Sequence, residues 1–192
     1  MKAKPTNHPG EVVLELNRRD EPLMAAAARV KSPFQIKKIL VPVDFSECAR
    51  KALQYAIPLA KEHQAAITLL YVIASPAYVG GEFGATQYQF EVETRASGEK
   101  ELAKLIVDEV RGEVSADTLV RSGSPALEII EVAKQLAADL IVISTHGHTG
   151  LTHVFLGSVA EHVVRWAPCP VLVVREQEHE FLAASGRHRA GS

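Results

Sequence analysis

Residues 143–162 gather small, hydroxyl and imidazole side chains that could bind an anion or a metal ion. They read ISTHGHTGLTHVFLGSVAEH, with one small-residue cluster at residues 144–147 and a second at Gly157 and Ser158. Nine residues separate Gly147 from Gly157, and three histidines lie in or between the two clusters. The chemistry that this stretch could support is phosphate binding, metal binding or nucleophilic catalysis.

Phosphate binding is favoured by the second cluster, which comes just before an apolar helical pattern. The first N–H groups of a helix have no intrahelical partners and lie at the positive end of its dipole, and a glycine lets an anion approach the backbone. Ser158, with Glu161 three residues later, also matches a capping box. The alternative is that the glycines serve turns and Ser158 only caps its helix. The Walker sequence and a GxGxxG after the first strand are both absent from the sequence.

Zinc is a second candidate ligand, because His146 and His148 are two residues apart and His153 follows. A structural zinc site normally needs four ligands, and no HExxH motif or neighbouring cysteine supplies the rest, so surface histidines are the alternative.

Covalent catalysis has less support. GxSxG is absent, and Cys48 and Cys169 lie in no obvious activating pattern. The residues themselves give no positive evidence for an enzyme.

The elements that must position this stretch are five short apolar segments separated by helical patterns. Such segments are typical of buried parallel strands, and their alternation with helices predicts βαβ units. We therefore predict an α/β fold with a doubly wound, five-stranded parallel sheet and helices on both faces. The predicted strands are residues 37–43, 65–73, 114–123, 139–145 and 170–175. The predicted helices follow residues 44–47, span about 87–111, begin at 124–125, and span 158–166.

Doubly wound sheets bind ligands outside the carboxyl ends of their strands, where the winding reverses. The segments after the first and fourth predicted strands, residues 44–46 and 144–147, are candidates for that crevice, although the pattern alone does not make these strands neighbours. Asp44 or Ser46 is expected to cap the first helix, with Glu47 three residues after Asp44 as in a capping box.

The composition limits the classes of partner and compartment. A net charge of −2 and a pI near 6.4 argue against a dedicated nucleic-acid or anionic-membrane surface. Two distant cysteines form no disulfide framework, and no segment reads as a signal peptide or a membrane span, so we expect a cytoplasmic protein. Residues 1–36 read as a partly disordered extension in which VVLEL could form a short strand, 37–176 as the domain and 177–192 as a flexible tail.

Three stretches together resemble the universal stress protein family. They are KKILVPVDFSECARKALQYAIPLA, LLYVI and ISTHGHTGLTHVFLGSVAEHVVRWAPCPVLVV, and the resemblance covers about residues 36–176. It implies a Rossmann-like fold of the adenine nucleotide alpha hydrolase type with strand order 3-2-1-4-5. The ATP-binding members are similar in having G-x-x-G, nine residues, and then glycine followed by serine or threonine. Gly147, Gly157 and Ser158 match that pattern, whereas Ser144 replaces its first glycine.

The resemblance also implies which residues surround the nucleotide. The nucleoside would lie against Pro42, Val43, Asp44, Val72, Ile143 and Ser144. The phosphates would lie among His146, Gly147, His148, Gly157, Ser158 and Val159. Asp44 would accept a hydrogen bond from the ribose or the adenine. His148 stands where family members often have Arg or Lys, and histidine is mostly neutral at pH 7, so ATP affinity is expected to strengthen as the pH falls toward 6.

The expected function is ATP binding, with Mg²⁺ on the phosphates, in a stress-response module. No base or arginine is placed for fast hydrolysis, so slow hydrolysis or autophosphorylation is the most that is expected. The resemblance implies a homodimer through residues 171–174, a predicted sheet edge. Three alternatives stay open: an interaction module whose pocket Ser144 has closed, the zinc site, and an enzyme that transfers adenylate and needs a second substrate pocket.

Overall fold

The computed structural model describes residues 2–5, 12–15, 35–74, 84–145 and 156–175. The chain divides into two compact units, Met1–Gln35 and Ile36–Ser192. In the first unit, β1 (Lys2–Pro5) pairs antiparallel with β2 (Val12–Glu15). The strand β2 falls within the VVLEL segment, whereas nothing in the sequence pattern indicated β1.

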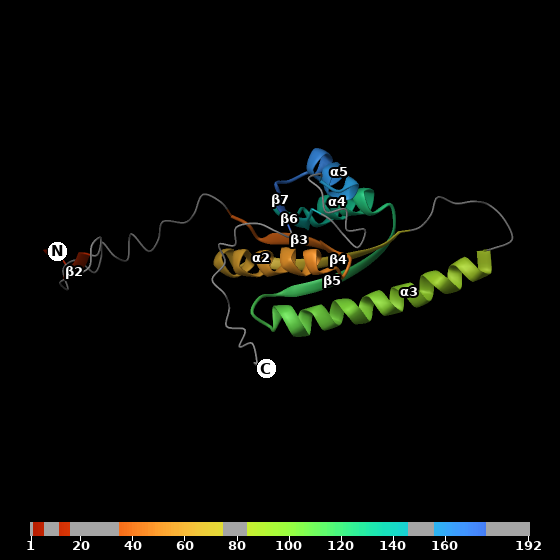
Figure 1. Cartoon of the computed structure of the whole chain (residues 1–192), viewed down its shortest axis with the longest axis horizontal. Coiled ribbons are helices and arrows are strands. Elements are labelled where there is room, and N and C mark those ends of the chain that lie inside the picture. Colours follow the sequence, from red (N-terminus) through yellow and green to blue (C-terminus); the bar gives the residue numbers. More distant parts are fainter. Residues whose placement is uncertain (1, 6–11, 16–34, 75–83, 146–155, 176–192) are drawn as a thin grey trace, which may run out of the picture. The chain divides into compact units, whose positions relative to one another are not determined.

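The second unit is built on a five-stranded parallel sheet in the order β5-β4-β3-β6-β7 (Figure 1). Numbered along this unit alone, the order is 3-2-1-4-5, so the predicted fold class is confirmed. Each strand lies inside, or within one residue of, its predicted apolar segment. The strands are β3 (Lys38–Val43), β4 (Ala66–Ala74), β5 (Ala116–Gly123), β6 (Leu140–Ser144) and β7 (Val171–Val174).

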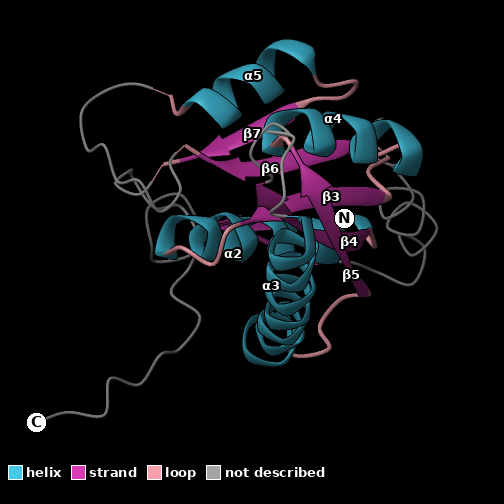
Figure 2. Ribbon diagram, turned by 90° about the vertical axis from the view of Figure 1, so that its right-hand side faces the viewer, coloured by secondary structure: helices cyan, strands magenta, loops and turns pink. Residues whose placement is uncertain are grey.

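Helices cover both faces of the sheet, with α2 and α3 on one side and α4 and α5 on the other (Figure 2). Residues of β4 alternate between the two layers: Ile67 and Leu69 pack toward α2 and α3, and Leu70 packs toward α4. Each such fully buried side chain contributes about 1.5–3 kcal/mol of transfer free energy. The helices are α2 (Glu47–His63), α3 (Gly84–Leu105), α4 (Pro125–Leu136) and α5 (Ser158–Trp166), with a π-helical turn η2 (Ile106–Val110) after α3.

The helix α3 differs from its prediction at both ends. It begins at Gly84, before the predicted start, and ends at Leu105, where η2 takes over. Arg111 closes η2 in a left-handed conformation, with its N–H donating to the carbonyl oxygen of Ile106 at 2.9 Å. Gly98, which weakens the helical pattern, has a packing role. A Cβ at Gly98 would lie only 2.6 Å from Cδ1 of Tyr71 on β4.

A carboxylate at the amino edge of the sheet fixes β3 beside β6. Oδ2 of Asp139 accepts hydrogen bonds from the backbone N–H groups of Lys37 and Lys38, at 2.8 and 3.0 Å. The N–H of Asp139 donates in return to the carbonyl oxygen of Lys38 at 2.9 Å. Three hydrogen bonds therefore set the position in which the two central strands enter the sheet.

Candidate functional site

The strands β3 and β6 are neighbours at the point where the winding of the sheet reverses. The two strands pair at Ile39 with Leu140 and at Leu40 with Ile141, and these are their only ladder pairs among the described residues. The pairing of β3 with β4 continues to Val43. The crossover helix after β3 covers one face and the one after β6 covers the other (Figure 2). This geometry is the one in which doubly wound sheets bind ligands.

The turn after β3 holds the carboxylate of Asp44 in place. Oδ1 of Asp44 accepts from the N–H of Ser46 at 3.1 Å and from its hydroxyl at 2.6 Å. The hydroxyl oxygen of Ser46 in turn accepts from the N–H of Ala49 at 3.2 Å, which makes Ser46 the N-cap of α2. Of the two predicted caps, Ser46 is therefore correct. Asp44 precedes the cap and orients it, and the capping box proposed for Asp44 and Glu47 is not formed.

The turn includes a residue in an uncommon conformation. Phe45 has a φ of +68°, in the left-handed region that bulky residues rarely adopt. Its ring lies 4.7 Å, centroid to centroid, from the ring of Tyr71 on β4, with 45° between the ring planes. Phe45 lies within the segment 44–46 that the sequence predicts for the crevice, whereas no pattern in the sequence indicated Tyr71. An aromatic residue directly after a predicted site aspartate was the only local signal.

The end of β6 is tied to the start of α5 by the backbone. The N–H of Thr145, a buried residue, donates to the carbonyl oxygen of Val174 on β7 at 2.9 Å. The carbonyl oxygen of Thr145 accepts from the N–H of Gly157, also at 2.9 Å. Ser144 and Thr145, the described part of the first cluster, are thereby brought next to Gly157 and Ser158 at one edge of the sheet, beside the strand that leads into the Asp44 turn.

The predicted capping box at Ser158 is wrong. Gly157 is the N-cap of α5, with φ −59° and ψ 149°, and Ser158 is the first helical residue. Glu161 uses its backbone N–H for the carbonyl oxygen of Gly157 and its carboxylate for Arg165, at 3.1 Å. Because a glycine cap has no side chain, no capping side chain occupies the N-terminal N–H groups of α5 in the described structure.

The backbone at Ser144 removes one objection to a serine in the place of a glycine. Ser144 is the last residue of β6 and lies in register with Val174. It is absent from the residues with positive φ in the described chain, so a Cβ imposes no conformational cost there. The side chain is half-buried at the strand end.

The apolar residues assigned to the nucleotide fall mainly on one face of the sheet. Val72, Ile143 and Val159 pack in the hydrophobic layer under α4 and α5. Pro42 is buried at the end of β3, and Val43 points into the opposite layer, toward α2. The remaining assigned residues, His146, Gly147 and His148, lie outside the described residues.

The zinc hypothesis concerns residues that the structure does not describe, because His153 also lies outside those ranges. Within the described ranges, no group of three or more His, Cys, Asp or Glu side chains could hold a metal ion. The same residues contain no helix with the length and apolar character to cross a bilayer.

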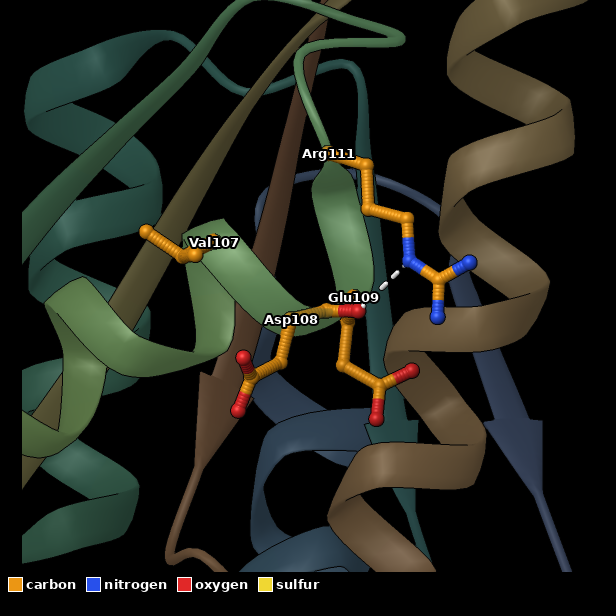
Figure 3. A pocket seen from close by; sticks show the side chains of 4 residues that line it. All are labelled: Val107, Asp108, Glu109 and Arg111. Atoms are coloured by element: carbon orange, nitrogen blue, oxygen red, sulfur yellow. Dashed lines mark hydrogen bonds between the residues drawn. The ribbon is translucent and has the colours of Figure 1, made fainter.

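A pocket of about 470 Å³ lies at η2 (Figure 3). It is lined by Val107, Asp108, Glu109 and Arg111. Nε of Arg111 donates to the carbonyl oxygen of Asp108 at 2.8 Å, and Oε2 of Glu109 accepts from Gln54 on α2 at 3.3 Å. Its polar groups therefore serve the packing of η2. Since η2 leads to the start of β5, this pocket is not at the carboxyl edge.

A sequence model of the universal stress protein family matches residues 35–175. The chain belongs to the universal stress protein family. Two curated relatives agree. A universal stress protein of Methanocaldococcus jannaschii is 38% identical over 144 residues, which cover 75% of this chain and 85% of the relative. Universal stress protein YxiE of Bacillus subtilis is 34% identical over 145 residues, which cover 72% of this chain and 98% of the relative.

Solved structures of the family share the fold of the second unit. The universal stress protein UspA from Lactobacillus plantarum is 32% identical and superimposes with a TM-score of 0.67, covering 74% of this chain and 99% of that one. Residues 1–34 precede the region that matches the family. The five-stranded sheet and its helices are therefore the family domain.

Proposed function

We propose that this universal stress protein binds ATP, with Mg²⁺ on the phosphates, at the carboxyl ends of β3 and β6. The observation that carries the proposal is the hydrogen bond from Gly157 to Thr145, which sets the start of α5 against the end of β6. A helix N-terminus without a side-chain cap then faces the same sheet edge as the Asp44 carboxylate. Free N–H groups and a positive dipole end suit the phosphates, and a fixed carboxylate suits the nucleoside.

Each part of the nucleotide has a proposed set of contacts. Asp44 would accept a hydrogen bond from the ribose or adenine, while Pro42, Val72 and Ile143 would provide apolar contact. The backbone N–H groups of Ser158 and Val159 would bind the phosphates, and Gly157, whose own N–H donates to Thr145, would border them. Val43 and Ser144 would border the nucleoside at the strand ends. The family resemblance adds His146, Gly147 and His148 on the phosphate side.

The fold itself is known with an adenine nucleotide. The universal stress protein from Archaeoglobus fulgidus, which shares the fold at 21% identity and a TM-score of 0.50, was solved in complex with dAMP. That identity supports a shared fold only, so the proposal for this chain rests on its own residues.

The proposed consequence of binding is regulatory. ATP would favour one conformation or one partner surface in the cytoplasm during stress, with hydrolysis or autophosphorylation slow at most.

We also propose a homodimer through β7, because this strand is at the edge of the sheet and its Val171, Leu172 and Val173 are only partly buried. Light scattering should give about twice the chain mass of 20.9 kDa; a monomer mass would contradict the dimer.

A direct test of the proposal is to identify the nucleotide that the protein carries. Protein purified from cells without added ATP would be studied by native mass spectrometry, with and without Mg²⁺. We expect a mass increment equal to ATP or its hydrolysis product. Elemental analysis of the same sample would reveal zinc, the outcome of the competing metal hypothesis. A protein that carries no nucleotide and takes up none from millimolar ATP would instead be an interaction module of the same fold.

A further inference from the structure

We propose that α3 is coupled to the Asp44 turn through the ring of Tyr71, so that displacement of α3 changes nucleotide affinity. The proposal rests on the ATP site proposed above and adds a means of regulating it. Tyr71 lies on β4 directly beside Val43, the residue before Asp44. Its ring contacts Phe45 in the turn and also lies against Gly98 of the helix.

The first contact joins Tyr71 to the turn. Phe45 has a left-handed backbone conformation, which is unfavourable for a bulky residue. Contacts with its neighbours must therefore stabilise this conformation. Two sets of contacts do so: the 4.7 Å ring contact with Tyr71, and the hydrogen bonds of Asp44 with Ser46 on either side of Phe45. A shift of the Tyr71 ring therefore acts on the residue between the two hydrogen-bonded partners of the turn.

The second contact joins Tyr71 to α3. A Cβ at Gly98 would lie 2.6 Å from Cδ1 and 2.7 Å from Cε1 of Tyr71. Gly98 is buried, and real Cβ contacts essentially never reach this distance. The helix therefore lies against the ring with no spare space. Because packed protein interiors are dense, a displacement of α3 should be passed through the Tyr71 ring to Phe45 in the turn.

The test begins with Gly98→Ala, which pushes the Tyr71 ring from the helix side at a position outside the proposed ATP site. We expect the dissociation constant of Mg²⁺-ATP, measured by calorimetry, to rise at least about fivefold, the lower end of ordinary coupling between sites. The matched control is Ser97→Ala, an exposed change on the same helix, which should leave the dissociation constant unchanged.

A double-mutant cycle decides whether Tyr71 carries the effect. In the Tyr71→Leu background, where the ring is absent, Gly98→Ala should no longer change the dissociation constant. Phe45→Leu, which removes the ring on the other side of the contact, should also abolish the effect and serves if a Tyr71 variant fails to fold. An equal effect of Gly98→Ala in all three backgrounds, or no effect in the wild type, would overturn the coupling.

A readout without nucleotide separates this inference from the ATP proposal. The amide of Ser46 donates to Asp44, so its hydrogen exchange reports on the turn itself. Gly98→Ala should accelerate this exchange in nucleotide-free protein, whereas Ser97→Ala should not. Faster exchange in a protein that binds no nucleotide would refute the ATP site and uphold the coupling. Unchanged exchange in a protein that binds ATP would refute the coupling alone.

Discussion

The backbone N–H of Gly157 donates a hydrogen bond of 2.9 Å to the carbonyl oxygen of Thr145. This bond sets the first turn of α5 against the end of β6, and Gly157 itself is the N-cap of that helix. A Ser, Thr, Asn or Asp in its place could cap, through its side-chain oxygen, the N–H groups that we assign to the phosphates. Gly157 therefore has two roles: its N–H fixes the helix, and its missing side chain leaves the helix start open.

Substitutions at Gly157 should change stability and ATP affinity in opposite directions. The φ and ψ of Gly157 are allowed for any residue, so Gly157→Asn and Gly157→Asp should fold and cap α5. We expect the free energy of unfolding to rise by a few tenths of a kcal/mol, to about 1 kcal/mol for Asp. ATP affinity should fall from Gly to Asn to Asp, because Asp adds charge repulsion. Urea unfolding and ATP titration check this; equal affinities would refute phosphate binding at this helix.

Ser144 should be compatible with ATP binding, because its backbone is already extended. Ser144→Gly should keep the dissociation constant of ATP within about threefold of the wild type, less than 1 kcal/mol. Ser144→Ala keeps the Cβ and removes the hydroxyl, so it isolates any hydrogen bond from the side chain. A gain in affinity of tenfold or more in Ser144→Gly alone would show that the serine obstructs the ligand.

The sequence predicts the sheet well for a physical reason. Strands that are buried on both faces, such as β6 with Ile141 and Val142, read as continuous apolar runs. Alternation with helices then predicts parallel pairing. The order of the strands is a tertiary property, and the family resemblance supplied it.

The details of the site depend on contacts between distant residues. The S-x-x-E pattern at Ser158 fits a capping box, yet Gly157, whose N–H donates to Thr145, is the N-cap and Ser158 is the first helical residue. No local pattern indicates that Gly98 lies against Tyr71, 27 residues away along the chain. Sequence reasoning therefore predicts the edge of the sheet at which we propose the site, and does not predict the contacts that shape this edge.

Asp139 provides a test of the amino edge that should leave the ATP site intact. Its Oδ2 accepts from two backbone N–H groups at the start of β3. Asp139→Ala should lower the free energy of unfolding by about 2 kcal/mol, as hydrogen bonds to charged groups are lost. Asp139→Asn keeps an oxygen acceptor and should lose less. ATP affinity, measured below the melting temperature, should be the same in all three proteins, and a large loss would argue that the two edges are not independent.

Cys169 should make stability depend on pH in the alkaline range. Burial, and then the negative charge of Asp139, raise the pKa of this thiol above its ordinary value of 9.0. The native state thus holds the proton more tightly than the unfolded chain. The resulting stabilisation is fully present below the pKa of the thiol in the unfolded chain. It is lost as the pH rises through the pKa of the thiol in the native state. As the pH rises from neutral through the ordinary thiol pKa and beyond, Cys169→Ala should lose less free energy of unfolding than the wild type in reductant; equal losses would contradict the shift.

The most direct test of the central claim is a titration of the full chain with Mg²⁺-ATP, followed by calorimetry, with Gly157→Asp and Asp139→Asn alongside. We predict saturable binding of one ATP per chain in the wild type and in Asp139→Asn, with binding by Gly157→Asp weakened at least about tenfold, or 1.4 kcal/mol. No saturable binding up to millimolar ATP, or equal binding by all three proteins, would contradict an ATP site at the start of α5.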